Sequence, residues 1–293
     1  MHIRRLFLRH PKRIAIAVLL LLLCILCPVS LYRSAYGLCV TRYTVSADID
    51  TPLRVVQLSD LHGAVFGENN ERLLSAVRDT APDLILVTGD TVNAWEPDVT
   101  ASTALIAALS EIAPVYVSLG NHEIAHAERF GSDFDAFWGD YAEVLDFSTA
   151  VVEINGVRVA LGGLYGYCSV HPEDTVDRET AFLDAFSARD ADVHLLLAHL
   201  PLLWTTDSDH SAAAHWNTLD AVFCGHNHGG QIIWPLLGGT YAPDMGYFPG
   251  RVWGLYEKDG AAPVILSRGL GSGTFVPRFN NVPEIVVCDV GVE

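Results

Sequence analysis

Residues 53–63 read LRVVQLSDLHG, a short apolar run that ends in an aspartate and a histidine. The run 53–58 predicts a buried strand, and Asp60 and His62 follow it directly. Further along the chain, apolar runs of strand length alternate with longer amphipathic stretches. This alternation is typical of an α/β fold in which strands and helices form separate layers.

The same reading places the other elements of the chain. We expect helices at 69–80, 99–112 and 178–188, and strands at 84–87, 115–119, 151–154, 157–161, 193–198, 221–224, 252–256, 264–266 and 284–289. Asn155-Gly156 between two strand-like runs predicts a tight hairpin. Residues 229–250 show no periodicity, and we expect them to form a long functional loop.

Side chains that can bind metal ions follow five of the predicted strands. They are Asp60, His62, Asp90, Asn121, His199, His226 and His228. In open α/β sheets, ligands bind outside the carboxyl ends of the strands, so these residues should meet in one crevice. Oxygen and imidazole donors without thiolate suit Mn, Fe, Co or Zn.

Two divalent metal ions are expected, because Asp90 lies at the centre of the strand order and can bridge them. Two adjacent cations stabilise the attacking and leaving oxygens of an in-line displacement, and they generate hydroxide near neutral pH. The ligand set therefore predicts hydrolysis of a phosphate ester by attack of a metal-bound hydroxide.

These motifs resemble those of the calcineurin-like metallophosphoesterase superfamily. The motifs are Asp60-x-His62, Gly89-Asp90, Gly120-Asn121-His122-Glu123, Ala198-His199 and Gly225-His226-x-His228. Gly229-Gly230-Gln231, Ser267-Arg268-Gly269-Leu270-Gly271 and Arg278-Phe279-Asn280 are similar to the membrane-associated bacterial branch typified by YkuE and YaeI. The resemblance implies a four-layer αββα sandwich.

The resemblance also implies a role for each motif residue. One metal ion would be held by Asp60, His62, Asp90 and His228, and the other by Asp90, Asn121, His199 and His226. His122 would be the catalytic residue, free of metal and close to the leaving oxygen. Phosphomonoesters, phosphodiesters and pyrophosphates stay open as substrates. Related enzymes that cleave UDP-2,3-diacylglucosamine make a lipid-linked or sugar-nucleotide substrate a candidate.

Two further residues are candidates for substrate binding. Trp234 belongs to an aromatic-rich segment that begins directly after His228 and is broken by Pro and Gly. This segment rests at the headgroup level of a membrane, lines a groove for an apolar chain of the substrate, or folds back onto the core. Arg278 has the forked guanidinium that suits a phosphate.

The N-terminal region is apolar and follows a basic flank. Residues 14–32 are 19 residues without a charge, and a helix of that length crosses roughly the 30 Å hydrocarbon core of a membrane. We expect a basic cytoplasmic N-terminus at 1–13, a transmembrane anchor or signal sequence at 14–32, a linker at 33–52 and the catalytic domain at 53–290. Because most basic residues precede the span, the positive-inside rule predicts a single-pass cell-membrane protein with an extracytoplasmic catalytic domain.

The rest of the chain is strongly acidic. Residues 43–293 carry 11 basic and 35 acidic side chains, a net charge of −24. Nucleic-acid binding needs a basic surface, so we expect no nucleic acid as partner. The sequence thus predicts a membrane-anchored metallophosphoesterase. The alternative is a catalytically inactive metal-binding interaction module, which would have no need of His122.

Overall fold

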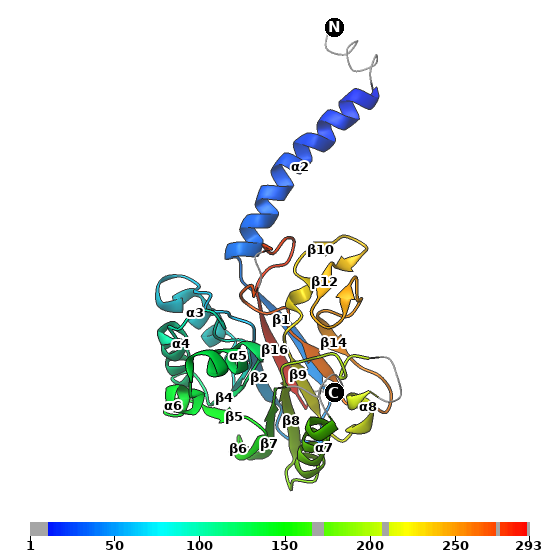
Figure 1. Cartoon of the computed structure of the whole chain (residues 1–293). Helices are drawn as coiled ribbons and strands as arrows, with labels where there is room; N and C mark the ends of the chain where they lie inside the picture. The colour runs from blue at the N-terminus through cyan, green and yellow to red at the C-terminus, as the bar shows by residue number, and fades with distance from the viewer. Residues whose placement is uncertain (1–10, 166–172, 207–210, 274–275, 292–293) are drawn as a thin grey trace.

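The computed structural model describes residues 11–165, 173–206, 211–273 and 276–291. Two six-stranded sheets face each other, and helices lie on their outer faces (Figure 1). The N-terminal helix α2 (Pro11–Tyr36) projects away from this body. This arrangement confirms the α/β sandwich that the sequence predicts.

Each sheet combines a parallel core with antiparallel neighbours. The first sheet runs in the order β1 (Cys39–Val45), β16 (Glu284–Val290), β2 (Leu53–Leu58), β3 (Leu84–Thr88), β4 (Val115–Ser118) and β5 (Glu143–Leu145). The second runs in the order β14 (Gly254–Tyr256), β15 (Val264–Leu266), β9 (Ala221–Cys224), β8 (Val193–Ala198), β7 (Val157–Leu164) and β6 (Ser148–Ile154). Strands β2 to β5 are parallel to one another, as are β7, β8, β9 and β15.

Three buried apolar clusters hold the layers together. The cluster between the two sheets includes Val55, Leu86 and Leu195. A second cluster packs the outer face of the first sheet against α3 (Glu71–Asp79), α4 (Thr100–Ser110), α5 (Asn121–Phe130) and α6 (Phe134–Trp138). The third packs the second sheet against α7 (Glu173–Ser187) and α8 (Ala212–His215). Two helical layers therefore enclose the two sheets, as a four-layer sandwich requires.

The segment 33–52, which we expected to be a linker, contains the end of α2 and strand β1. Strand β1 pairs in parallel with β16 at the edge of the first sheet. Its side chains alternate between exposed and partly covered positions, because an edge strand has little of its surface inside the core. Because the strand contains threonine, arginine and tyrosine, it has no apolar run that would predict a strand.

The aperiodic segment 229–250 forms a 3-10 turn, η2 (His228–Gly230), and two short hairpins. The hairpins are β10 (Ile233–Trp234) with β11 (Gly238–Gly239), and β12 (Tyr241–Ala242) with β13 (Gly246–Tyr247). Strands of two residues are too short to give a period of two in the sequence. Another 3-10 turn, η1 (Glu68–Asn70), precedes α3.

Helix α2 contains a long section, Lys12–Tyr36, whose most apolar 18 residues have a mean hydropathy of 3.0 and are not buried. A helix of this length and composition is able to cross a membrane, and a signal sequence shares both properties.

Candidate functional site

The predicted ligands follow the carboxyl ends of five strands, β2, β3, β4, β8 and β9. Backbone hydrogen bonds tie these strand ends together. The Asp60 N–H donates to Gly89 O at 3.0 Å, and the His62 N–H donates to Asp90 O at 2.9 Å. Across the two sheets, the His226 N–H donates to Asp60 Oδ1 at 2.8 Å. The crevice expected from the strand order is therefore formed by both sheets.

Four of the predicted ligands form one buried cluster. Asp60, His62, Asp90 and His228 each offer a donor atom, and these atoms all lie within 4.8 Å of one another. The two imidazole Nε2 atoms of His62 and His228 are 3.2 Å apart. Asp90 Oδ2 lies 3.6 Å from His62 Nε2, and Asp60 Oδ1 lies 3.7 Å from His228 Nε2.

A second cluster shares Asp90 with the first. It contains Asp90, His199 and His226. Asp90 Oδ2 lies 3.4 Å from His199 Nε2, and Asn121 Oδ1 lies 3.1 Å from the same nitrogen. Asp90 is common to both groupings, and their members are among the ligands that the resemblance implies.

The donor set fits two divalent cations. Metal–ligand bonds of about 2.0–2.2 Å place two ligands of one ion roughly 3–3.5 Å apart, close to the separations found here. The Asp60 Oδ2 atom is buried and has no hydrogen-bond partner among the described residues. His199 Nδ1 donates to Thr88 O at 2.8 Å, so Nε2, which faces Asp90, is the ring nitrogen that remains for a metal ion. The residues therefore fit a dinuclear divalent metal site.

The backbone at the site is strained. Positive φ angles occur at Asp60 (53°), His62 (49°), Asp90 (53°), His226 (71°) and His228 (47°). Such angles cost a non-glycine residue on the order of 1–3 kcal/mol and persist only where the surrounding structure fixes them. Their concentration at the predicted ligands is the pattern of a functional site.

Two motif glycines are required by close approach. A Cβ atom on Gly120 would lie 2.3 Å from Asp90 Oδ1, and one on Gly225 would lie 2.7 Å from Asp60 Oδ2. Any larger residue would push these carboxylates out of position. The glycines before Asn121 and His226 therefore serve the ligand geometry.

The electrostatics of the two clusters differ. Burial lowers the pKa of His62 and of His228 to about 3, so both rings are neutral donors at neutral pH. Burial opposes charge on His199 as well, but the Asp90 carboxylate raises the pKa of His199 to about 10. The negative charge of Asp90 dominates the second cluster and would be balanced by a bound cation.

His122 lies beside the first cluster. Its Nδ1 atom is 3.3 Å from His62 Nδ1 and accepts a hydrogen bond from the Ala94 N–H at 3.0 Å. The backbone N–H of His122 donates to Asp90 Oδ1 at 2.8 Å. Burial lowers the pKa of His122. Because Nδ1 is an acceptor, the ring proton is on Nε2, which leaves that atom as the donor.

Glu123 is a residue whose position the sequence reasoning did not establish. Its side chain is fully buried, and its carboxylate accepts hydrogen bonds from the N–H groups of Asp90, Thr91, Val92 and Gly120 at 2.7–3.0 Å. Burial, followed by the charge of Asp90, raises the pKa of Glu123 to about 7. The available signal was its place three residues after Gly120, at N3 of a helix, where a glutamate caps free N–H groups.

Asp244 is a second residue at the site that the sequence did not indicate, because it lies in the aperiodic segment and follows no predicted strand. Its Oδ2 atom is 3.2 Å from His226 Nε2. No period or spacing in the sequence connects it to the ligand motifs.

The two predicted substrate-binding residues lie in different places. Arg278 is buried beside the first cluster, with Nη2 at 3.4 Å from His228 Nδ1, and donates to the carbonyls of Gly271 and Arg268. Burial lowers the pKa of Arg278 to about 10, so it stays charged at neutral pH. Trp234 is half-exposed on β10 and lines a cavity together with helix α2.

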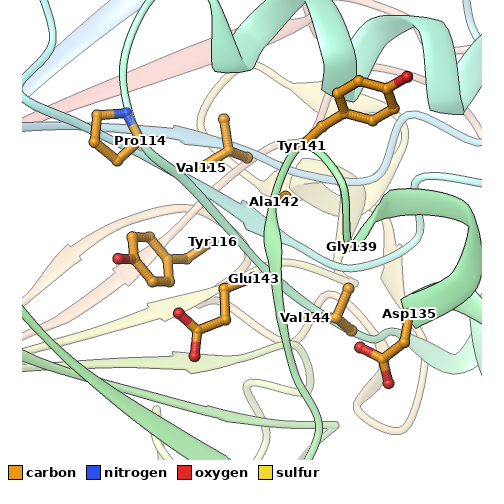
Figure 2. Close-up of a pocket in the computed structure, with 9 residues that line it drawn as sticks. All are labelled: Pro114, Val115, Tyr116, Asp135, Gly139, Tyr141, Ala142, Glu143 and Val144. Atoms are coloured by element: carbon orange, nitrogen blue, oxygen red, sulfur yellow. The ribbon is translucent and has the colours of Figure 1, made fainter.

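A separate cavity of about 540 Å³ lies at β4 and β5 and is shown in Figure 2. Its lining includes Pro114 and Val115, at the amino end of β4, together with the carboxylates of Asp135 and Glu143. The metal-ligand motif Asn121-His122 follows the other end of the same strand. This cavity is therefore not part of the site.

Comparison with known proteins agrees with this geometry. The family model for calcineurin-like phosphoesterases matches residues 53–230. Phosphodiesterase YaeI of Escherichia coli is 27% identical, over 83% of this chain and 84% of the relative. The uncharacterized metallophosphoesterase YkuE of Bacillus subtilis is 27% identical, over 80% of this chain and 77% of the relative.

Among solved structures, the chain is similar to the 5'-nucleotidase precursor of Thermus thermophilus, with a TM-score of 0.47 and 15% identity. The match covers 82% of this chain and 54% of that structure, so the chain spans about half of its length. The family match includes all five strand-end motifs completely. The chain belongs to the calcineurin-like phosphoesterase family and is a metal-dependent phosphoric ester hydrolase.

Proposed function

We propose that this hydrolase is a membrane-anchored phosphodiesterase with two divalent metal ions. The observation that carries the proposal is the shared carboxylate of Asp90, whose Oδ2 atom faces His62 on one side and His199 on the other. One ion would be held by the cluster of Asp60, His62 and His228, and the other by the cluster of His199 and His226, together with Asn121.

Two bound cations supply charge stabilisation at the reacting phosphorus and a water molecule that ionises near neutral pH. His122 holds a proton on Nε2 and acts on the leaving oxygen. Glu123 fixes the backbone of the loops that carry Asp90 and Asn121. Asp90 itself holds the start of helix α5 through the His122 N–H.

A phosphodiester is the substrate class that we favour, because the similar protein YaeI of Escherichia coli is named a phosphodiesterase. Arg278 is the proposed contact with a substrate phosphate. The Nη1 atom of Arg278 is buried and has no hydrogen-bond partner among the described residues. The residue lines a cavity of about 620 Å³ together with Tyr36 and Phe66. A lipid-linked ester suits the apolar walls of this cavity and the neighbouring helix α2. Trp234, on the other side of that helix, would contact the apolar part of such a substrate.

Membrane anchoring is the remaining part of the proposal. Helix α2 is long and apolar enough to span a bilayer, and five basic residues precede residue 14. By the positive-inside rule, this basic flank supports a catalytic domain outside the cytoplasm.

Hydrolysis of bis(p-nitrophenyl) phosphate by the full chain in detergent tests the enzymatic proposal. We expect activity that requires Mn, Fe, Co or Zn, disappears after chelation and returns when a metal is added back. Asp90→Ala should be inactive under all these conditions. Comparing phosphomonoesters, pyrophosphates and lipid phosphodiesters then ranks the substrate classes. If the protein binds two metal ions tightly but hydrolyses none of these substrates, it is instead a metal-binding interaction module.

A further inference from the structure

The hairpin formed by β10 and β11 has an unusual turn. Residues 235–237 are Pro-Leu-Leu, where hairpin turns normally carry Gly, Asn or Asp. Leu236 is completely exposed at 105% of its reference area and has a φ of 72°, and Leu237 is 66% exposed. A leucine in left-handed backbone at a fully solvated tip gains nothing from the fold itself.

The hairpin also lacks charge in a strongly acidic chain. None of residues 229–243 is charged, although residues 43–293 carry a net charge of −24. Exposed apolar tips without charge mark surfaces that contact an apolar partner. The position of the hairpin relative to helix α2 indicates which partner this is.

Asn280 joins the hairpin to helix α2. Its backbone N–H donates to Ser30 Oγ at 2.9 Å, and its side-chain amide donates to Ile233 O at 3.1 Å. The base of the hairpin is therefore level with Ser30, which lies inside the charge-free section 14–32.

The hairpin then continues toward the N-terminal part of the helix. Trp234 and Pro235 line a cavity of about 730 Å³ together with Leu23, Leu26 and Ser30. At a rise of about 1.5 Å per residue, Leu23 lies roughly 10 Å further along the helix axis than Ser30. Tyr32 and Tyr36, which are exposed and lie on the other side of Ser30 in the chain, are residues of the type found at the membrane–water boundary.

From this placement we propose that the β10–β11 hairpin inserts into the lipid bilayer beside α2 and forms a second membrane contact. The inference rests on the proposed role of α2 as a membrane span. The hairpin begins three residues after η2, whose first residue is His228, and Thr240 after the hairpin donates back to Gly230 O at 3.0 Å. Insertion would therefore hold the metal-binding loop at a fixed height above the lipid surface.

Photo-crosslinking to lipid tests this contact in the full chain, reconstituted in phosphatidylcholine vesicles. The photoreactive residue benzoylphenylalanine replaces Leu236 in one variant. In a second it replaces Leu20, an exposed residue in the middle of α2, as the lipid-facing control. In a third it replaces the exposed Ala188, which directly follows α7 in the chain. Helix α7 lies at the opposite end of the molecule from α2 (Figure 1).

We expect lipid adducts at position 236 with a yield within a few-fold of position 20 and at least tenfold above position 188. No adduct at position 236 alongside a strong adduct at position 20 would overturn the proposal, as would a crosslinked dimer in place of the lipid adduct. Absence of lipid adducts at position 20 would remove the span on which it rests. Hydrolysis of bis(p-nitrophenyl) phosphate by each variant reports separately on the enzyme, so loss of activity is distinguishable from loss of membrane contact.

Discussion

The carboxylate of Glu123 accepts a hydrogen bond from the backbone N–H of Asp90 at 2.8 Å, between two loops that come from different strands. The same carboxylate accepts the N–H of Gly120 at 2.8 Å. One buried side chain thus joins the loop after β3 to the start of helix α5. The position of the proposed bridging ligand depends on a residue that binds no metal in this arrangement.

Glu123→Gln should therefore lower both stability and metal affinity. The amide would present an NH₂ group to some of the four N–H donors. Each buried group left unpaired lowers the free energy of unfolding by about 1–3 kcal/mol. Thermal unfolding and metal content of the purified protein measure the two effects. Glu128→Gln, on the exposed side of the same helix, is the matched control and should behave like the wild type. An unchanged melting temperature for Glu123→Gln would contradict the role of this carboxylate.

Metal stoichiometry should separate the shared ligand from the others. Because Asp90 belongs to both clusters, Asp90→Ala should lose both ions and nearly all activity. His226→Ala and His228→Ala each remove a ligand from one cluster, so each should mainly weaken one ion. Elemental analysis of the three variants gives the answer. Retention of two ions per chain by Asp90→Ala would exclude the bridging role.

His122→Ala should keep a near-normal metal content while its activity falls by about 10²–10⁴, the range of general acid catalysis. A leaving group that needs little protonation, such as p-nitrophenolate, should be less affected than an alkoxide. A series of diesters with leaving groups of rising pKa measures this dependence. If the loss is equal across the series, His122 acts through charge or hydrogen bonding rather than by proton transfer.

The residues of the candidate site could be found in the sequence because they follow the ends of strongly apolar strands. Leu84–Thr88 and Ala221–Cys224 are buried on both faces, so their sequence patterns are clear and the residues after them lie at the carboxyl ends of the strands. Strand β1 was not predictable in the same way, because an edge strand with polar side chains lacks that pattern. Glu123 and Asp244 act through side-chain contacts between loops, and no periodicity encodes such contacts.

Asn281 connects helix α2 to the loop that carries His228. Its N–H donates to Ser34 Oγ at 3.0 Å, and its side-chain amide donates to His228 O at 2.7 Å and Gln231 O at 3.2 Å. Asn281→Ala leaves two buried carbonyls without this donor and should weaken metal binding at the first cluster. Ser34→Ala removes only the contact with the helix and should leave metal binding near normal. Isothermal titration of both variants with Mn²⁺ compares them, and a near-normal affinity for Asn281→Ala would contradict the proposed role of its side chain.

The charges that flank the apolar section predict the side of the membrane on which the domain lies. Arg4, Arg5, Arg9, Lys12 and Arg13 precede the apolar section, whereas Arg33 and Arg42 follow it. This asymmetry predicts a cytoplasmic N-terminus and an extracytoplasmic catalytic domain. A protease added to intact cells or, in an organism with an outer membrane, to spheroplasts should therefore degrade the domain. A cytoplasmic protein in the same sample should survive until the cells are lysed.

Replacing the first five basic residues by Asn should reduce or reverse the accessibility of the domain to the protease, because the remaining positive charge then lies after the span. Complete protection of the wild-type domain before lysis would place the site in the cytoplasm and show that another signal overrides the basic flank.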